Sequence, residues 1–293
     1  MQYVIYNPLA NNKAGFASAK SYLDGKIDGD VEYKDITKIA DLGAFIGRLT
    51  DSDRVILAGG DGTINRFINA LDATPACAVD LIAVGSGNDF KHDIEKRGEV
   101  SGDFIRLNKY IENLPTVTVN GETHKFINGI GYGIDGYCCE KGDEFRAKSD
   151  KPVNYTSIAV KGLLFHFKPR KATVTVDGKT FSFKKVWLAP TMKGKFYGGG
   201  MMVAPEQDRF AEDKTVTVVV WHGTGKLSTL MRFPKIFKGE HVKYTKMISI
   251  IKGSEIKISF DKPTALQIDG ETVSNVTEYT VKCNQAVTLK SAA

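Results

Sequence analysis

The sequence predicts two domains, an α/β N-terminal domain with a parallel sheet and a C-terminal antiparallel β-sandwich-like domain. In the first 115 residues, apolar runs that read as buried strands alternate with segments of helical periodicity. From about Val117 the pattern changes to short alternating runs, some of them separated by Asp-Gly turns. We therefore place the domains at residues 1–115 and 116–285, and we leave open whether a tail, residues 286–293, returns to the first domain.

Strands and helices alternate along the first domain. The expected elements are strand Tyr3–Tyr6, helix Gly15–Leu23, strand Val31–Ile36, a helix around Ile39–Leu49, strand Arg54–Leu57, a helix with apolar positions from Ile64 to Leu71, and strand Val79–Val84. This alternation predicts a parallel sheet with its ligand at the carboxyl ends of the strands.

The second domain is expected to be mainly antiparallel. The expected strands are Thr116–Val119, Lys125–Ile130, Thr173–Val176, Lys184–Leu188, Val216–Val220, Ile256–Phe260 and Ala265–Ile268. Two helices interrupt them, near Gly136–Lys148 and Tyr155–Phe167. Both tryptophans, Trp187 and Trp221, fall in strand patterns and are expected in the core.

The turn Gly59–Asn65 is the stretch around which the first domain is organised. It lies between a buried strand and a helix, a geometry that points free backbone N–H groups at a phosphate. Its three glycines remove the Cβ atoms that would keep a diphosphate away from the backbone. Asp61 adds a carboxylate suited to Mg²⁺, and Thr63 can cap the helix or donate its hydroxyl to a phosphate. The alternative interpretation is a tight turn without a ligand.

Two further loops follow strands of the same sheet. Asn7–Lys13 follows the first strand, and Gly85–Phe90 follows the strand at Val79–Val84. Because parallel strands end at one edge of the sheet, we expect both loops and the Gly59–Asn65 turn to meet there. Three such loops at one edge predict a nucleotide site.

Charge is spread unevenly along the chain. Residues 1–115 hold 13 Lys and Arg against 17 Asp and Glu, and residues 116–293 hold 27 against 17. A basic second half implies an anionic partner, and charge alone leaves nucleic acid, anionic lipid and phosphorylated small molecules open. Residues 223–247 interleave six Lys and Arg with apolar side chains. They predict either a solvated basic helix or a surface that settles on an anionic membrane.

No signal peptide and no membrane-spanning run is visible, and the four cysteines show no CxxC pair. We therefore expect reduced thiols and a cytoplasmic protein.

A series of motifs extends over nearly the whole chain. They are Asn7-Pro8, Gly59-Gly60-Asp61-Gly62-Thr63-Ile64-Asn65, Gly85-Ser86-Gly87-Asn88-Asp89-Phe90, Phe126–Asp135, Lys238-Gly239-Glu240-His241 and Asp269-Gly270-Glu271. In this order they resemble the diacylglycerol kinase catalytic-domain family, specifically the soluble bacterial lipid kinases. The Gly-Gly-Asp-Gly-Thr turn alone is also typical of NAD kinases, which share the fold.

The resemblance implies that loops of the first domain bind ATP and that a lipid enters a cleft between the domains. The implied nucleotide contacts are Asn7, Pro8, Leu9, Ala10, Asn11, Gly59, Gly60, Asp61, Gly62, Thr63, Ile64, Asn65 and Ser86, with Thr37 after the second strand as a further one. The resemblance also implies that Glu271 accepts the proton of the lipid hydroxyl, with Asp269 beside it. Which of these two carboxylates is the base is left open.

The resemblance also implies a second, structural Mg²⁺ in the loop Phe210–Thr215. Asp213 would give its carboxylate, and Phe210 and Thr215 would give main-chain oxygens. The chain departs from the family at several positions, which are Ala10-Asn11 in the first loop, Arg66 after the glycine turn, Lys91-His92, and Lys214 for a common glycine in the metal loop. These departures leave open the identity of the lipid, and whether catalysis or the structural Mg²⁺ site is weakened.

We expect an ATP- and Mg²⁺-dependent lipid kinase that phosphorylates a hydroxyl of diacylglycerol or a related membrane lipid. The alternatives are an NAD kinase-like enzyme with a soluble acceptor and a non-catalytic module that binds nucleotide or anionic lipid. No Walker A lysine motif and no protein-kinase motif set occurs. The expected partners are the lipid substrate and, peripherally, anionic membrane, without nucleic acid. A homodimer is left open.

Overall fold

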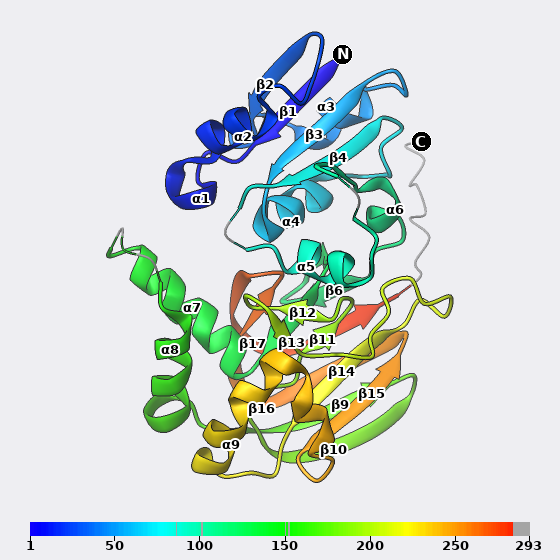
Figure 1. Cartoon of the computed structure of the whole chain (residues 1–293). Helices are drawn as coiled ribbons and strands as arrows, with labels where there is room; N and C mark the ends of the chain where they lie inside the picture. Colours follow the sequence, from blue (N-terminus) through cyan, green and yellow to red (C-terminus); the bar gives the residue numbers. More distant parts are fainter. Residues whose placement is uncertain (86, 101, 150, 152, 284–293) are drawn as a thin grey trace. The chain divides into compact units, whose positions relative to one another are not determined.

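A computed structural model of the chain describes residues 1–85, 87–100, 102–149, 151 and 153–283 (Figure 1). The tail 286–293 and the implied nucleotide contact Ser86 lie outside the described residues. The chain forms two units that divide between Leu114 and Pro115. Within the described ranges, no helix is long and apolar enough to cross a membrane. All four cysteines are free thiols.

Unit 1 is built on a five-stranded sheet with the order β2-β1-β3-β4-β5. Strands β1 to β4 run parallel, as predicted, and β5 pairs antiparallel with β4 at the edge. The strands are β1 Gln2–Tyr6, β2 Val31–Asp35, β3 Arg54–Gly59, β4 Ala78–Ala83 and β5 Ile105–Arg106. The helices are α1 Ala10–Lys13, α2 Gly15–Leu23, α3 Leu42–Gly47, α4 Asp61–Ala70, α5 Asp89–Lys96 and α6 Asn108–Ile111.

The helix expected around Ile39–Leu49 is shorter than predicted. It is α3, which begins after Asp41, because the Asp41 carboxylate accepts a hydrogen bond from the Ala44 N–H at 2.8 Å and caps the helix. The antiparallel strand β5 was not predicted, since two residues carry no alternating pattern.

The sheet of unit 1 is buried on both faces, as parallel sheets usually are. Every residue of β3 after Arg54 is buried. Ala19 and Leu23 of α2 belong to a cluster of buried apolar side chains with Val4, Ile56 and others from β1, β3 and β4. The core of unit 1 thus fixes where the strands end.

Unit 2 contains a ten-stranded sheet. Its main order is β15-β14-β11-β8-β16-β17-β6-β7, while β9 pairs with both β10 and β16. The strands are β6 Thr116–Val119, β7 Glu122–Lys125, β8 Gly129–Tyr132, β9 Arg170–Val176, β10 Lys179–Val186, β11 Thr191–Met192, β14 Val216–Trp221, β15 Ile248–Gly253, β16 Glu255–Ile268 and β17 Glu271–Lys282. A separate pair consists of β12 Phe196–Tyr197 and β13 Met201–Met202.

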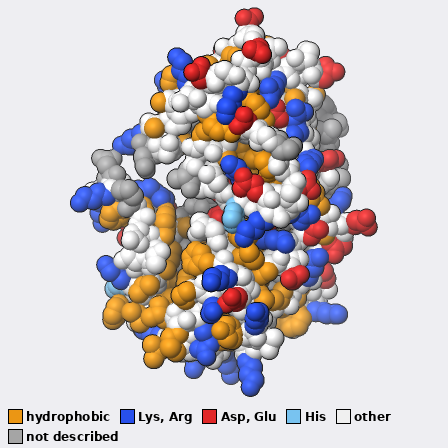
Figure 2. Space-filling view, viewed as in Figure 1, with side chains coloured by type: hydrophobic (Ala, Val, Ile, Leu, Met, Phe, Trp, Pro, Cys, Tyr) orange, Lys and Arg blue, Asp and Glu red, His pale blue; other side chains and the backbone are white. Residues whose placement is uncertain are grey.

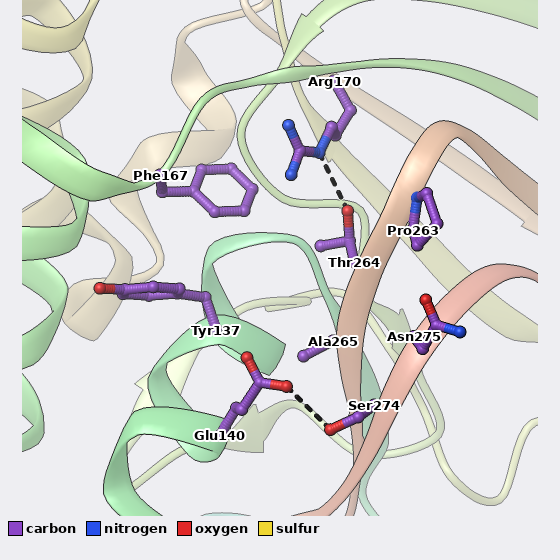
Figure 3. A pocket seen from close by; sticks show the side chains of 9 residues that line it. All are labelled: Tyr137, Glu140, Phe167, Arg170, Pro263, Thr264, Ala265, Ser274 and Asn275. Atoms are coloured by element: carbon purple, nitrogen blue, oxygen red, sulfur yellow. Dashed lines mark hydrogen bonds between the residues drawn. The ribbon is translucent and has the colours of Figure 1, made fainter. Parts of the chain in front are cut away.

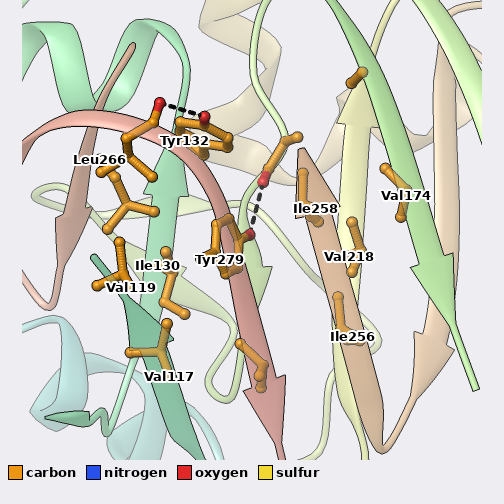
Figure 4. Close-up of a cluster of buried hydrophobic side chains, with 14 of the residues drawn as sticks. Val117, Val119, Ile130, Tyr132, Val174, Val218, Ile256, Ile258, Leu266 and Tyr279 are labelled. Carbon is orange, nitrogen blue, oxygen red and sulfur yellow. Dashed lines mark hydrogen bonds between the residues drawn. The ribbon is translucent and has the colours of Figure 1, made fainter. Parts of the chain in front are cut away.

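The long strand β16 lets this sheet form two layers around one core. Its first half pairs with β9, and its last three residues pair with β8. The register with β17 shifts between Ser259 and Leu266. The two runs predicted as separate strands, Ile256–Phe260 and Ala265–Ile268, are therefore one irregular strand. Side chains from both parts fill the core shown in Figure 4.

A second cluster of buried side chains lies under the helices of unit 2. Trp187 and Trp221 are fully buried there, as predicted. The helices are α7 Ile134–Arg146, α8 Tyr155–Lys161, the π-helical turn η1 Gly162–His166, α9 Lys226–Arg232, and the 3₁₀ turns η2 Phe233–Lys238 and η3 Glu240–Lys243.

The prediction of a single basic helix within residues 223–247 is wrong, because the helix is shorter than this segment. Helix α9 ends at Arg232, and two 3₁₀ turns follow. Pro234 cannot donate the backbone bond that would continue α9, and Gly239 adopts a left-handed φ of 67° between the turns.

The buried hydroxyls of the unit 2 core give a prediction about stability. The Tyr279 and Thr191 hydroxyls lie 2.8 Å apart and are both buried. Tyr279→Phe leaves the Thr191 hydroxyl without this partner, so we expect unit 2 to lose about 1–3 kcal/mol of unfolding free energy. Urea unfolding followed by tryptophan fluorescence measures this, because both tryptophans lie in unit 2.

The double variant Tyr279→Phe/Thr191→Val removes both polar groups and should recover part of the loss. The exposed Thr118, which pairs with Thr123 at 2.9 Å, provides the control, since Thr118→Val should change stability by less than about 0.5 kcal/mol. Equal effects of Tyr279→Phe and Thr118→Val would contradict the prediction.

Candidate functional site

The strands of unit 1 end level with one another. Tyr6, the last residue of β1, pairs with Asp35 in β2 and with Ala58 in β3, while Gly59 pairs with Ala83 in β4. The loops that follow these four strands therefore begin at the same edge of the sheet. This is the arrangement expected for the loops after β1, β3 and β4, and it adds the loop after β2.

Asp61 ties two of these loops together. Its Oδ2 accepts a hydrogen bond from the Asp89 N–H at 2.7 Å, and its Oδ1 accepts one from the Phe90 N–H at 3.0 Å. The Asp61 N–H in turn donates to the Gly87 carbonyl at 2.9 Å. The buried carboxylate thus accepts the hydrogen bonds of the first N–H groups of α5 and fixes that helix against the start of α4.

This contact was not foreseen from the sequence, which assigned the Asp61 carboxylate to Mg²⁺. A carboxylate offers about four lone-pair positions, so these hydrogen bonds are compatible with a role toward Mg²⁺, directly or through water. That role stays a prediction.

Glycines are required where the two loops meet. A Cβ on Gly60 would lie 2.2 Å from the Gly87 carbonyl oxygen, and one on Gly85 would lie 2.5 Å from the Gly60 nitrogen. Side chains at these positions would push the loops apart. The glycines therefore allow two backbone segments to pack directly, which is a structural reason for their presence in addition to room for a phosphate.

The other residues of the glycine turn that are implied to contact the nucleotide differ in which of their atoms a ligand could reach. Gly62 is exposed, whereas Thr63, Ile64 and Asn65 are buried in the first turns of α4. The Asn65 carbonyl accepts a hydrogen bond from Asn69 at 3.0 Å. Ile64 has its side chain in the core, so only its backbone is suited to contact a ligand.

The loop after β1 forms a compact turn. The Asn7 side chain accepts a hydrogen bond from the Leu9 N–H at 3.0 Å, and the Ala10 N–H donates to the Asn7 carbonyl at 3.1 Å. Pro8 lies between them, Leu9 is exposed, and Asn11 adopts a φ of 49° in the short helix α1. These five residues present a turn of polar backbone at the sheet edge.

Thr37 lies exposed after β2. Its N–H and hydroxyl both donate to Asp35 Oδ1, at 2.9 and 2.7 Å. Partial burial raises the pKa of Asp35, but these two hydrogen bonds and the nearby Lys38 and Arg66 charges outweigh it, so the pKa lies below its usual value. Arg66, one of the departures from the family, thus faces an ionised carboxylate.

In unit 2, Asp269 plays a role similar to that of Asp61. Its Oδ2 accepts from the Ile127 N–H at 2.7 Å, and its Oδ1 accepts from the N–H groups of Asn128 and Gly129 at 2.8 and 2.9 Å. The Asp269 N–H donates to the Gly129 carbonyl at 3.0 Å. This carboxylate is buried and holds the segment that leads into β8.

Arg209 supports the same segment from the other side. It is buried, and its guanidinium donates to the Ile127 carbonyl at 3.0 Å and to Asn128 Oδ1 at 3.4 Å. This contact could not be predicted from local sequence patterns, because it joins residues 81 and 82 positions apart.

Glu271 has a different environment from that of Asp269. It is the first residue of β17, directly after the Asp269-Gly270 turn, and it is exposed. Within the described residues no hydrogen bond or ion pair engages its carboxylate, although its charge is felt at Cys139 on α7. Of the two carboxylates, Glu271 has the accessibility that a base for an external hydroxyl requires.

Asp135 is a buried carboxylate to which the sequence interpretation assigned no role. It lies buried in the first turn of α7, and burial raises its pKa to about 7 despite the nearby Tyr197 hydroxyl, which lowers it. The proximity of Asp135 and the burial of Tyr197 raise the pKa of the tyrosine. Among the residues that the structure describes, neither Asp135 Oδ2 nor the Tyr197 hydroxyl completes a hydrogen bond of good geometry. The sequence feature that could have indicated Asp135 is its place at the end of the motif Phe126–Asp135.

Unit 2 also holds a pocket of about 310 Å³ (Figure 3). It lies between α7, the start of β9 and the strands β16 and β17, and its lining combines aromatic rings with polar groups. The residues that line it are Tyr137, Glu140, Phe167, Arg170, Pro263, Thr264, Ala265, Ser274 and Asn275. Arg170 donates to the Thr264 hydroxyl at 3.0 Å, and Ser274 donates to Glu140 at 2.8 Å. The volume is at the lower end of those found for small-ligand sites.

The implied metal loop Phe210–Thr215 fits a divalent cation poorly. Asp213 Oδ1 accepts from the N–H and hydroxyl of Thr215 at 3.2 and 2.8 Å, and Lys252 Nζ lies 3.4 Å from Asp213 Oδ2. The lysine thus places a positive charge of the protein's own beside the carboxylate. Among the described side chains, no group of three His, Cys, Asp or Glu is placed to hold a metal ion. Lys214 keeps a left-handed φ of 48°, the conformation a glycine adopts readily.

The arrangement in unit 1 suits a polyanion. Helix α4, of ten residues, begins at the edge where the four loops meet, and helix N-termini attract phosphate groups. The arrangement in unit 2 offers an accessible carboxylate beside a rigid turn and, separately, an amphipathic pocket.

Comparison with known proteins identifies both parts of the chain. Residues 2–119 match the diacylglycerol kinase catalytic domain, and residues 128–289 match the YegS C-terminal NAD kinase beta sandwich-like domain. YtlR of Bacillus subtilis is 23% identical over an alignment 292 residues long, and the match covers 92% of this chain and 92% of that protein. The diacylglycerol kinase of Bacillus subtilis is 27% identical over an alignment 239 residues long, and the match covers 76% of this chain and 72% of that protein.

A solved structure of a diacylglycerol kinase from Bacillus anthracis shares the fold, with a TM-score of 0.61 at 18% identity. The match covers 98% of this chain and 94% of that one. The matched domains extend over most of the chain and follow one another in the same order as the two units. The chain therefore belongs to the family of lipid kinases that carry a diacylglycerol kinase catalytic domain and a YegS-type, NAD kinase-like C-terminal domain.

Proposed function

We propose that this lipid kinase transfers the γ-phosphoryl group of ATP, with Mg²⁺, to a hydroxyl of diacylglycerol or a related membrane lipid. The observation that carries the proposal is the loop cluster of unit 1, in which Asp61 fixes the start of α5 against the start of α4. Relatives named diacylglycerol kinase, among them those from Bacillus subtilis and Mycobacterium tuberculosis, support the choice of lipid.

Unit 1 would act by binding and positioning the triphosphate. Phosphoryl transfer depends mainly on alignment and on neutralisation of charge, and Mg²⁺ supplies part of that neutralisation. The backbone of the Gly59–Asn65 turn, the Asn7–Asn11 turn and the α4 N-terminus would bind the phosphate oxygens. Thr37, whose hydroxyl is already oriented by Asp35, would border the nucleotide.

Unit 2 would supply the base. Glu271 would take the proton of the lipid hydroxyl as the hydroxyl oxygen attacks the γ-phosphorus, and the bond to the β–γ bridging oxygen breaks to release ADP. Asp269 would hold the neighbouring backbone in place and would not take the proton, because its oxygens already accept three backbone hydrogen bonds. The structure of unit 2 thus favours Glu271 over Asp269 as the base.

The lining of the pocket in unit 2 favours a lipid over a soluble dinucleotide as acceptor. The rings of Tyr137 and Phe167 form one wall, and the polar side chains of Glu140, Arg170 and Ser274 lie around it (Figure 3). A mixed wall of this kind suits a molecule that joins hydroxyl or ester groups to hydrocarbon.

A survey of acceptors tests the proposed function. We expect labelled phosphate to pass from ATP to diacylglycerol or a related lipid in detergent micelles, and to require Mg²⁺. NAD should remain unlabelled. Labelling of NAD alone would support an NAD kinase-like enzyme, and nucleotide binding without any transfer would support a non-catalytic module.

The Asp61 contact gives a prediction about nucleotide affinity. Asp61→Asn places an NH₂ group against the N–H groups of Asp89 or Phe90, so the two loops should separate. We expect ATP to bind roughly 5- to 100-fold more weakly, which corresponds to about 1–3 kcal/mol. The loss should persist when Mg²⁺ is removed with EDTA, and equilibrium binding of a fluorescent ATP analogue measures it.

Asp72 is an exposed aspartate of the same unit and provides the matched control, since Asp72→Asn should leave ATP affinity unchanged. If Asp61→Asn weakens binding only when Mg²⁺ is present, the residue acts through the metal and the loop contact is not its main role.

The two carboxylates of unit 2 should respond differently to substitution. Glu271→Gln should lower kcat by about 10²- to 10⁴-fold, the usual contribution of a general base, without changing the melting temperature. Asp269→Asn should lower both kcat and stability, because an NH₂ group would face the donors of Ile127, Asn128 and Gly129. Steady-state kinetics and tryptophan fluorescence during unfolding measure the two effects.

Glu278, an exposed residue of β17 that pairs with Lys257 at 2.9 Å, provides the control substitution Glu278→Gln. Near wild-type kcat in Glu271→Gln, together with an inactive but fully stable Asp269→Asn, would transfer the role of base to Asp269.

A further inference from the structure

Three apolar side chains protrude from unit 2 into solvent. Phe165 is 71% exposed, Leu227 is 66% exposed and Met231 is 63% exposed, and no other large apolar side chain described in unit 2 reaches these values. Single exposed apolar residues are ordinary on protein surfaces, but a group of them marks an interaction site.

The two elements that carry them are joined. Lys226, at the start of α9, donates from Nζ to the Leu164 carbonyl in η1 at 2.8 Å, and α9 packs against η1. Leu227 and Met231 are four residues apart in α9 and therefore lie on one face of the helix. Figure 2 shows apolar side chains gathered among Lys and Arg over the region of α8 and α9. We call Phe165, Leu227 and Met231 the apolar tips.

The backbone that carries Phe165 is held in place by buried neighbours. Leu163 and Phe167 on either side of Phe165 are buried in the cluster that contains Trp187 and Trp221. Between these two anchors, the chain forms the π-helical turn η1, which directs Phe165 outward. Single π turns are uncommon in helices and occur frequently at functional sites. The exposure of Phe165 is therefore fixed by the fold.

Almost all charged residues in the segments that carry the apolar tips are basic. Residues 155–168 and 223–247, which contain α8, η1, α9, η2 and η3, hold eight Lys and Arg and one acidic residue. That residue, Glu240, is paired with Lys235 at 2.7 Å. Apolar side chains surrounded by cations are complementary to a bilayer with anionic headgroups, in which the rings and aliphatic chains enter the interface and the cations remain at the headgroups.

We propose that Phe165, Leu227 and Met231 insert into the interface of an anionic lipid bilayer and dock unit 2 on it. This inference rests on the proposed function in one respect, because a kinase that takes its acceptor from a bilayer needs such a contact. A bilayer is a better match than a protein partner, since the tips protrude individually from two elements, whereas protein interfaces bury apolar cores of closely matched shape.

Co-sedimentation with vesicles in the absence of ATP tests the proposal. The wild-type chain should bind vesicles of phosphatidylcholine with phosphatidylglycerol more strongly than vesicles of phosphatidylcholine alone, and 0.5 M NaCl should weaken this binding. The triple variant Phe165→Ser/Leu227→Gln/Met231→Gln should bind at least tenfold more weakly. Its side chains are exposed, so its melting temperature should match that of the wild type.

The double variant Phe181→Ser/Ile250→Gln removes exposed apolar side chains from β10 and β15 and provides the control, which should bind as the wild type does. In a separate variant, Phe165→Trp, the emission should shift to shorter wavelength on anionic vesicles. Equal binding of the triple variant and the wild type would overturn the proposal. So would a dimer that the triple variant converts to a monomer while vesicle binding stays unchanged, since the surface would then be an interface between copies.

A kinase assay separates this proposal from the proposed function. In detergent micelles with a short-chain diacylglycerol, the triple variant should keep the wild-type kcat, and on anionic vesicles it should lose activity. Vesicle binding by a wild-type chain that phosphorylates no lipid would overturn the proposed function and leave the docking surface in place. Phosphorylation in micelles by a wild-type chain that binds no vesicles would overturn the docking surface alone.

Discussion

The loops of each unit depend on one kind of interaction, a buried aspartate whose carboxylate accepts hydrogen bonds from consecutive backbone N–H groups of another loop. Asp61 does this for the start of α5, and Asp269 does it for the segment Ile127–Gly129. Such hydrogen bonds are charge-assisted and stronger than those between neutral groups. Because a buried N–H group without a partner is costly, each aspartate determines the path of two glycine-rich segments at once.

The turn before β17 shows how backbone geometry separates two acidic residues that are close in sequence. Asp269 and Gly270 both have positive φ, 47° and 98°, and connect Ile268 to its partner Glu271. Two positive φ values in a two-residue connection are typical of the tight turns that match strand twist. Asp269 lies in the turn with its carboxylate directed to backbone donors, whereas Glu271 begins the next strand and is exposed. The turn thus keeps a structural carboxylate and an accessible one apart.

The sequence predicted what depends on local pattern. The order of strand, loop and helix in unit 1, the antiparallel unit 2 and the burial of both tryptophans agree with the structure. It could not predict what depends on distant contacts. The partners of Asp61 lie 28 and 29 residues away, and the burial of Asp135 depends on elements that only folding brings together. The pocket in unit 2 likewise combines α7 with strands more than 120 residues later.

Most of the net positive charge of the second half of the chain lies in two segments. Residues 155–168 and 223–247 contain eight of the 27 Lys and Arg that follow residue 115, and one of the 17 Asp and Glu. Elsewhere in unit 2 cations are often matched, as in the pairs of Lys257 with Glu278 and Lys252 with Asp213. A uniform positive surface would attract any polyanion, including nucleic acid. The net positive charge of the elements around three apolar side chains instead favours a surface that is both anionic and apolar within a few ångströms, and a bilayer interface has both properties.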